Sequence, residues 1–231
     1  METALVTGAN RGIGYALVKA LVDSDFRVLA GCRDLENSVG LKKLESSGSI
    51  QILELDVSSD ESVEAAARKS PDRIDIIVNN AGLMPERGNE SIAEIDFNHL
   101  RSAFEVNVLG AARVIRSFLP RLRRSNRPRI LNVSSGLGSI AERDSSTYYA
   151  YAVSKAALNM LTRSTAFEFA PEGITVVAIS PGWVRTDMGG EEADISPEES
   201  AAALVEAIRK IGPNLSGKFL DRFGQTGKYV W

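Results

Sequence analysis

The sequence lacks several features on which whole classes of protein depend. It holds one cysteine and one histidine in 231 residues, Cys32 and His99, so it can form neither an intrachain disulfide nor a cluster of cysteine and histidine ligands for a metal ion. No apolar run is long enough to span a bilayer, and Met1 and Glu2 lead into a short apolar stretch rather than a signal peptide. We therefore expect a cytoplasmic protein without a membrane span or a bound metal.

The chain also lacks a large excess of charge of either sign. Its 27 basic and 30 acidic residues give a net charge of −3, which creates no overall field to attract nucleic acid or an anionic membrane. One stretch, RLRRSNRPR at 121–129, is rich in arginine. We interpret it as the solvated C-terminal turn of a helix, where cations complement the helix dipole. Because no aromatic or basic surface elsewhere extends it, we expect no nucleic-acid partner.

What the sequence has is a regular alternation of short apolar runs with longer amphipathic stretches, which is typical of βαβ units. We predict strands at 4–7, 27–32, 50–56, 74–80, 129–135, 174–180 and 217–220. We predict helices at 13–24, 35–46, 60–69, 98–124, 149–169 and 197–211. No repeat or linker divides the chain, so residues 1–231 are expected to form a single domain. The expected α/β fold is a Rossmann-type, doubly wound and mostly parallel sheet of about seven strands, with helices on both faces.

Three glycines lie directly after the first expected strand, in TGANRGIG: Gly8, Gly12 and Gly14. Glycines at such a place let a phosphate approach the backbone N–H groups at the N-terminus of a helix. By themselves they are also typical of an ordinary tight turn. Their position between a strand and a helix favours a dinucleotide site.

Tyr151 and Lys155, in YAVSK, are four residues apart and so share one face of the helix expected at 149–169. Tyr148 and Tyr149 have no lysine at that spacing. A phenol normally titrates near pH ~10, and a neighbouring ammonium favours the phenolate and lowers that pKa. The pair therefore predicts a tyrosine that transfers a proton near neutral pH.

Ser134 and Ser135 end the strand expected at 129–135. A hydroxyl at the carboxyl edge of the sheet can hydrogen-bond a substrate carbonyl oxygen and hold it within reach of the tyrosine. Taken by itself, this serine pair is better interpreted as closing the turn after the strand.

Together, TGANRGIG, NNAG at 79–82, the serine pair, YAVSK and PGWVRT at 181–186 resemble the short-chain dehydrogenase/reductase family over nearly the whole chain. Within this family the chain looks closest to small carbonyl reductases of the C-factor and sniffer type. That narrower likeness depends on TGANRGIG, YAVSKAALN and the ending SGKFLDRFG.

The resemblance implies four catalytic residues. Ser135, followed by Gly138, matches the SxxG element and would orient the substrate. Tyr151 matches the catalytic acid and base, and Lys155 matches the residue that lowers the tyrosine pKa and binds the ribose hydroxyls. Asn107, in FEVNVLG, matches the residue that helps to position a water in the proton relay.

The resemblance also implies a dinucleotide site. The glycine turn would hold the pyrophosphate, Asp56 and Val57 would line the adenine, and the segment 181–186 would face the nicotinamide. The residues expected to bind the cofactor are Gly8, Asn10, Arg11, Gly12, Ile13, Gly14, Arg33, Asp56, Val57, Asn80, Ala81, Gly82, Tyr151, Lys155, Pro181, Gly182, Val184 and Thr186.

The choice between NADP and NAD depends on the end of the second strand. An acidic residue about 20 positions after the glycines accepts the ribose hydroxyls of NAD, whereas an arginine accommodates the 2′-phosphate of NADP. Asp34 lies at that distance from Gly14, but Arg33 is the first charged side chain after the strand, and Arg11 adds a second cation. We therefore expect NADPH as cofactor, and Asp34 with NAD is the alternative.

Other residues have plainer interpretations. We expect His99 to be a structural or surface residue and Cys32 to be a small buried side chain near the adenosine site. Trp183 either lines the substrate site or packs on the sheet. The segment between Thr186 and Pro197 is short and rich in glycine and acidic residues, so we expect an open site for several small or aromatic carbonyl compounds.

These features predict an enzyme that transfers hydride from NADPH to a small aldehyde, ketone or quinone, with Tyr151 as the general acid. Two alternatives stay open: an NAD-dependent alcohol dehydrogenase, and an NAD(P)-binding signalling or redox-sensing protein. Ser135, Tyr151 and Lys155 together argue against the second, because binding alone needs no general acid. The resemblance also implies a homodimer or homotetramer formed through the helices at 98–124 and 149–169.

Overall fold

The chain is built around one parallel sheet. In the computed structural model, which describes residues 1–36, 38–46, 48–86, 88 and 91–231, seven strands lie in the order β3-β2-β1-β4-β5-β6-β7. All the pairings between neighbours are parallel, so the predicted sheet is confirmed. The strands are β1 (Thr3–Thr7), β2 (Arg27–Cys32), β3 (Ile50–Glu54), β4 (Ile76–Asn79), β5 (Arg129–Val133), β6 (Thr175–Ile179) and β7 (Phe219–Leu220).

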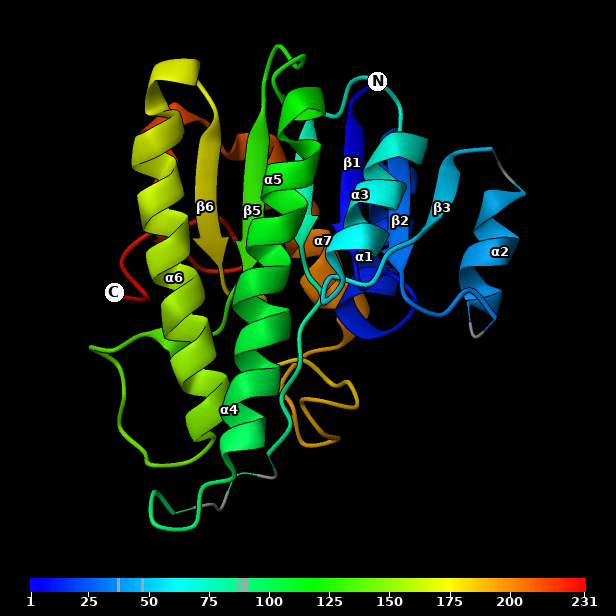
Figure 1. The fold of residues 1–231 in the computed structure, drawn as a ribbon. Helices are drawn as coiled ribbons and strands as arrows, with labels where there is room; N and C mark the ends of the chain where they lie inside the picture. The colour runs from blue at the N-terminus through cyan, green and yellow to red at the C-terminus, as the bar shows by residue number, and fades with distance from the viewer. Residues whose placement is uncertain (37, 47, 87, 89–90) are drawn as a thin grey trace.

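Helices cover both faces of the sheet, as the doubly wound pattern predicts (Figure 1). One apolar core joins α1 and α7 to one face, and a second core joins α3, α5 and α6 to the other. In the described part of the chain, none of the helices has the length and apolar character to cross a membrane. The helices are α1 (Gly12–Val22), α2 (Val39–Glu45), α3 (Asp60–Lys69), α4 (Phe97–Phe104), α5 (Gly110–Leu122), α6 (Tyr149–Phe169) and α7 (Pro197–Lys210).

The strand order reverses direction between β1 and β4. From β1 the chain adds β2 and then β3 on one side, and it crosses back to add β4 to β7 on the other side. At such a reversal the loops after the two central strands diverge and leave a crevice at the carboxyl edge of the sheet. The glycine turn follows β1 and the NNAG segment follows β4, so both border this crevice.

Four strands end one or two residues earlier than the apolar runs predicted. Asp56, Asn80, Ser135 and Ser180 were expected inside strands, and each lies just past the end of one. Polar groups of the loops explain two of these boundaries. The Asp56 carboxylate accepts the Ser58 N–H at 2.9 Å, and the Ser135 hydroxyl accepts the Leu137 N–H at 3.2 Å. Side chains that bind their own loop replace the next ladder hydrogen bonds.

The helices differ from prediction in two places. The helix expected at 98–124 is α4 and α5 joined by a π-helical turn, Glu105–Leu109, which inserts an extra residue into the turn that carries Asn107. The helix expected at 35–46 begins only at Val39. There the Asp34 carboxylate accepts the Glu36 N–H at 2.9 Å, which forms a local turn before the helix. Residue 37 of that predicted helix lies outside the described residues.

The arginine-rich stretch 121–129 is not simply a solvated helix end, and that prediction is wrong for two of its members. Arg129 begins β5 and is fully buried, where it pairs with Glu2 and donates to a carbonyl at the end of α7 at 2.7 Å. Arg127 donates to two further carbonyls there. The two guanidiniums thus satisfy the carbonyl end of α7, where positive charge is favoured.

Candidate active site

The glycine turn packs against the loops that follow β4 and β6. Gly8 adopts a positive φ of +64°, and a Cβ on it would lie 2.9 Å from Ala81 Cα. A Cβ on Gly14 would lie 2.2 Å from Gly8 O and 2.6 Å from Asn80 Nδ2. Only glycine fits at these positions, because a side chain would collide with backbone. The structure therefore brings the TGANRGIG and NNAG segments together as the sequence predicted.

Thr7, which the sequence analysis did not assign to the site, ties these two segments together. Its hydroxyl accepts the N–H groups of Asn80 and Ala81, both at 3.0 Å. Asn80 in turn donates from Nδ2 to the carbonyls of Thr7 and Gly8, at 2.8 and 3.2 Å. A threonine at the end of the first strand was the only signal for this role. These bonds fix the glycine turn against β4.

The N-terminus of α1 has the properties of an anion site. Its N-cap, Arg11, makes no side-chain cap hydrogen bond, and the first turn carries no acidic residue. The first N–H groups of a helix need acceptors, and a phosphate supplies them where glycines allow close approach. The residues present therefore fit the pyrophosphate of a dinucleotide.

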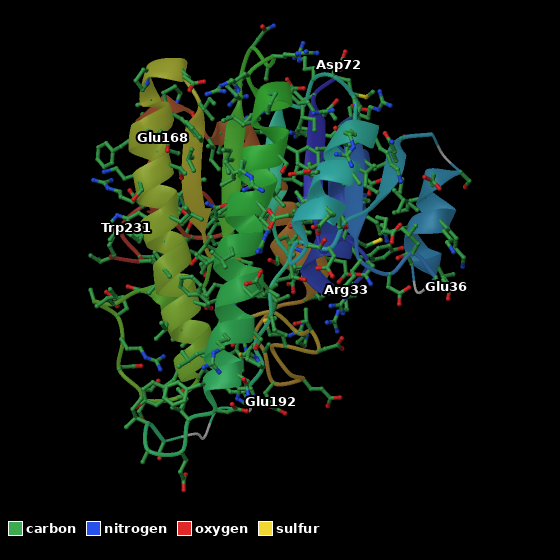
Figure 2. All side chains as sticks on the ribbon, in the orientation of Figure 1. Arg33, Glu36, Asp72, Glu168, Glu192 and Trp231 are labelled. Carbon is green, nitrogen blue, oxygen red and sulfur yellow. The ribbon has the colours of Figure 1, made fainter. Side chains whose placement is uncertain are left out.

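Three side chains are candidates to bind the adenosine ribose of the cofactor or its 2′-phosphate, and they have different surroundings. Arg33 lies exposed at the carboxyl edge, just after β2, where Figure 2 labels it. The Asp34 carboxylate accepts the Glu36 N–H of its own loop. Arg11 forms an exposed ion pair with Asp187 at 2.5 Å.

Tyr151, Lys155 and Ser135 meet where α6 begins beside the end of β5. Tyr151 and Lys155 are both buried on α6, and the Lys155 ammonium lies 5.5 Å from the centre of the Tyr151 ring. The ammonium donates to Val133 O, at the end of β5, at 2.7 Å. Ser135 follows two residues later, and a hydrogen bond from its hydroxyl lowers the pKa of the Tyr151 phenol. The three residues that the motifs singled out are thus brought together.

Burial is the main influence on the pKa values of Tyr151 and Lys155. It raises the pKa of Tyr151 to about 12, against the hydrogen bond from Ser135 that lowers it, and the negative charge of Glu86 adds to the rise. Burial also lowers the pKa of Lys155 to about 8. The expectation that Lys155 brings the phenol pKa below its normal value is wrong for the chain as described. Desolvation disfavours the phenolate, and the ammonium is bound to Val133 O rather than to the phenol.

Asn107 links three segments around the site. Its Oδ1 accepts the Leu83 N–H at 2.7 Å, and its Nδ2 donates to Leu83 O and to Ser154 Oγ, both at 2.8 Å. The π-helical turn directs this buried side chain toward the loop after β4. A Cβ on Gly82 would lie 3.4 Å from Asn107 Oδ1 and 3.7 Å from Lys155 Nζ, so Gly82 keeps this corner open.

The remaining predicted cofactor residues lie on the loops of the same edge. A Cβ on Gly12 would lie 3.2 Å from Thr186 Cγ2, so the segment 181–186 reaches the glycine turn. Val184 pairs with Ile195 in a short bridge that closes the segment after β6 into a flap. Trp183 lies on this flap with 53% of its surface exposed, and its Nε1 donates to Gly189 O at 2.8 Å. The flap is short, as expected, and hydrogen bonds order it.

The end of the chain also borders the site, which the sequence analysis missed. The Tyr229 and Trp231 rings stack on Phe219, with ring centres 4.9 and 5.6 Å away. Ser180 Oγ donates to Tyr229 Oη at 3.3 Å, and a Cβ on Gly136 would lie 3.0 Å from the Tyr229 ring. The segment thus lies beside Gly136, the residue after Ser135. No local pattern predicts contacts across about 90 residues.

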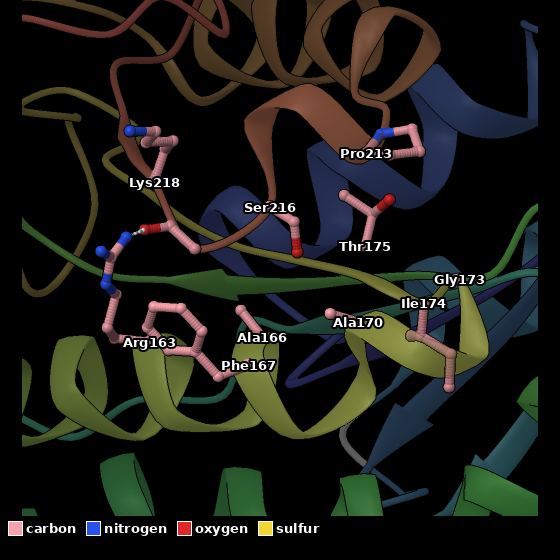
Figure 3. Close-up of a pocket in the computed structure, with 11 residues that line it drawn as sticks. Arg163, Ala166, Phe167, Ala170, Gly173, Ile174, Thr175, Pro213, Ser216 and Lys218 are labelled. Atoms are coloured by element: carbon pink, nitrogen blue, oxygen red, sulfur yellow. Dashed lines mark hydrogen bonds between the residues drawn. The ribbon is translucent and has the colours of Figure 1, made fainter.

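A hollow of about 310 Å³ lies elsewhere, between the second half of α6 and the segments that precede β6 and β7 (Figure 3). There Arg163 donates to Gly217 O at 2.7 Å and stacks on Phe167. The described lining residues include none of the predicted site residues. It opens at the amino edge of the sheet, so it is not the candidate active site.

A family model and the solved structures of similar proteins support the assignment of this edge of the sheet as the candidate active site. The family model for short chain dehydrogenases matches residues 2–197, and the chain belongs to this family. Solved structures similar to this chain include an NADPH-bound carbonyl reductase and an NADP-bound short-chain dehydrogenase/reductase, which together with the family confirms the predicted nicotinamide cofactor.

Individual relatives narrow the likeness. The carbonyl reductase Sniffer of D. melanogaster superposes with a TM-score of 0.94 and 30% identity, over 100% of both chains. An NADPH-bound carbonyl reductase from chicken fatty liver has a TM-score of 0.90 and 31% identity, over 100% of this chain and 99% of that one. The short-chain dehydrogenase anuI of Penicillium roqueforti is 37% identical over 98% of this chain and 96% of its own. The predicted resemblance to sniffer-type carbonyl reductases is confirmed.

Proposed function

We propose that this protein is an NADPH-dependent reductase of small carbonyl compounds. The observation that carries the proposal is the convergence of Ser135, Tyr151 and Lys155 at the carboxyl edge, next to an uncapped helix N-terminus that fits a pyrophosphate. The carbonyl reductases to which the chain is similar support the substrate class.

In this proposal each residue has a separate task. NADPH, when bound, supplies a hydride to the carbonyl carbon of the substrate. The Tyr151 phenol donates its proton to the developing alkoxide, and the Ser135 hydroxyl hydrogen-bonds the same oxygen where negative charge grows. Because burial raises its pKa to about 12, the phenol is protonated at neutral pH and carries the proton that the alkoxide takes up.

The cofactor would be held by the residues that line the crevice at the carboxyl edge of the sheet, where the strand order reverses. The first N–H groups of α1 would bind the pyrophosphate, and Lys155 and Asn107 would lie toward the nicotinamide ribose and the proton relay. We assign the 2′-phosphate to Arg33. Its guanidinium is exposed at the end of β2, whereas the neighbouring Asp34 carboxylate binds its own loop. Arg11 is already paired with Asp187, so its contribution is secondary.

We also propose that two copies associate through α4, α5 and α6; in Figure 1 α4 and α5 follow one another in one column that lies beside α6. This region exposes several large apolar side chains, and three of them, Phe104, Leu109 and Val153, line a groove of about 490 Å³ between α4 and α6. Such a surface supports a closed two-fold contact. A cytoplasmic location stays a prediction. The exposed large apolar side chains on α4, on the π-helical turn after it and on α6 are Phe97, Phe104, Leu109, Val153, Met160 and Phe167.

Tyr151→Phe tests the proposed reaction. Removal of the hydroxyl alone should lower kcat for NADPH-dependent carbonyl reduction by about 10²- to 10⁴-fold, the usual contribution of a general acid, and leave cofactor affinity nearly unchanged. Steady-state kinetics on a panel of aldehydes, ketones and quinones, with a fluorescence titration of NADPH, measure both. Tyr149→Phe, on the same turn, is the matched control. A Tyr151→Phe enzyme within about threefold of the wild-type kcat would refute the assignment.

A further inference from the structure

The helix that carries Tyr151 has no cap of its own. Its N-cap residue, Tyr148, is in the left-handed region with φ of 56° and makes no side-chain cap hydrogen bond. The first turn of α6 carries no acidic residue. The N–H groups of this turn therefore need acceptors from elsewhere in the chain.

Glu86 supplies one from the loop after β4. Its Oε1 accepts the backbone N–H of Tyr151 at 2.6 Å, across 65 residues of sequence. The same loop packs on the helix start, because a Cβ on Gly88 would lie 2.8 Å from the Tyr148 ring. A carboxylate at a helix N-terminus is stabilised by the helix dipole. Glu86 thus holds the backbone of the very residue proposed to donate the proton.

Burial of the Glu86 carboxylate costs more free energy than capping the helix requires. Glu86 is 4% exposed, and among the described residues its second oxygen, Oε2, has no hydrogen-bond partner. A serine or asparagine N-cap with extended backbone caps a helix without burying a charge, but position 148 is in the left-handed region. A buried carboxylate with one unpartnered oxygen beside Tyr151 indicates a role for its charge as well as for its hydrogen bond.

The charged groups near this end of α6 act in opposite directions on the phenol. Within the described part of the chain, Lys155 lies on the same helix, Glu86 reaches in from the loop after β4, and Arg143 binds the Thr147 carbonyl just before the helix. A negative charge near the phenol disfavours the phenolate, and a positive charge favours it.

We infer that Glu86 is a positioning residue for Tyr151: its carboxylate fixes the first turn of α6 through the Tyr151 N–H, and its negative charge disfavours the phenolate form of the same residue. The inference rests on the proposed reductase activity. It requires that the hydrogen bond and the charge of Glu86 have separable effects.

Two variants separate them. Glu86→Gln keeps an oxygen that can accept the Tyr151 N–H but removes the charge, and Glu86→Ala removes both. In NADP-dependent alcohol oxidation the phenol must lose its proton first, so the limb of the pH profile of kcat/KM that reports Tyr151 should move. We expect Glu86→Gln to move it to lower pH by about one unit, the effect of one nearby charge. Glu86→Ala should also lower kcat by about 10-fold to 100-fold, since the helix start is no longer fixed.

A second measurement does not depend on turnover. Tyrosinate absorbance is titrated in each enzyme and in the same enzyme with Tyr151→Phe, and the difference isolates the Tyr151 phenol. Glu86→Gln should shift this difference titration to lower pH, whereas Glu142→Gln, which removes an exposed carboxylate from a nearby loop, should not. Thermal melting establishes that each variant is folded.

The two proposals fail in different ways. The reductase activity is supported if the wild type reduces carbonyls and Tyr151→Phe does not. If, in the same experiments, Glu86→Gln has the pH profile and the tyrosinate titration of the wild type, the proposed role of Glu86 is overturned. If the wild type shows no NADPH-dependent turnover, the proposed function fails, and the tyrosinate titration still decides whether the Glu86 charge acts on Tyr151.

Discussion

Replacing Lys155 with methionine should make the protein more stable while removing its proposed activity. Lys155 is buried with 4% of its surface exposed, and its ammonium donates a hydrogen bond to Val133 O. Burial lowers its pKa from 10.5 to about 8. A group whose charged form is disfavoured in the native state reduces the free energy of unfolding wherever it must stay charged.

The pKa shift gives the size of this effect. At about 1.4 kcal/mol for each pH unit, the native state loses about 3 kcal/mol at neutral pH. Methionine fills a similar volume without a charge, and the lost hydrogen bond to Val133 O offsets about 1 kcal/mol. We therefore expect Lys155→Met to raise the free energy of unfolding by about 2 kcal/mol, which corresponds to a Tm increase of about 4–8 °C.

The pH dependence gives the sharper test. Below pH 8 both the native and the unfolded chains hold the lysine proton, so the cost is complete. Between about pH 8 and pH 10.5 the native chain releases the proton before the unfolded chain does, so the stability of the wild type rises with pH. The difference between wild type and Lys155→Met should therefore shrink over this range.

Denaturant unfolding of both proteins, at neutral pH and near pH 10, measures this difference. Lys19→Met, on the exposed face of α1, is the control and should leave stability within about 0.5 kcal/mol of the wild type. The reasoning is refuted if Lys155→Met is less stable than the wild type at neutral pH, or if the difference is the same at both pH values.

Three further predictions concern the cofactor, the assembly and the substrate. Arg33→Ala should lower kcat/KM with NADPH about tenfold, or about 1.4 kcal/mol, and leave kcat/KM with NADH unchanged; an equal loss with both cofactors would favour Asp34 as the ribose-binding residue. Met160→Glu, on the exposed apolar face of α6, should convert the proposed dimer to a monomer in light scattering, and a monomeric wild type at micromolar concentration would contradict the interface. Tyr229→Ala should raise KM for aromatic carbonyl substrates by about threefold or more, through loss of an aromatic wall, and an unchanged KM would show that this ring does not contact substrate.

Much of the site was accessible from the sequence. The alternation of apolar runs and amphipathic stretches predicted every strand and the layered fold, because burial on both faces of a parallel sheet imposes that pattern on each element separately. The four-residue spacing of Tyr151 and Lys155 placed both on one helix face for a similarly local reason. The glycines after β1 were recognisable because a close backbone approach excludes any side chain there.

The tertiary structure decided what depends on residues far apart in the chain. The hydrogen bond from Tyr151 to Glu86, the tail against Gly136 and the burial of Arg129 against α7 link segments that no periodicity connects. The side chain on the π-helical turn, Asn107, likewise binds a residue of the loop after β4.

The protonation of the Tyr151–Lys155 pair shows the division most clearly. Sequence spacing alone placed an ammonium near a phenol and so predicted a lower phenol pKa. The folded chain buries both groups, and desolvation raises the pKa of Tyr151 to about 12 and lowers that of Lys155 to about 8. Spacing along a helix determines which groups are neighbours, but only the packing of the whole chain determines how much water each group retains, and hydration sets the free energy of a charge.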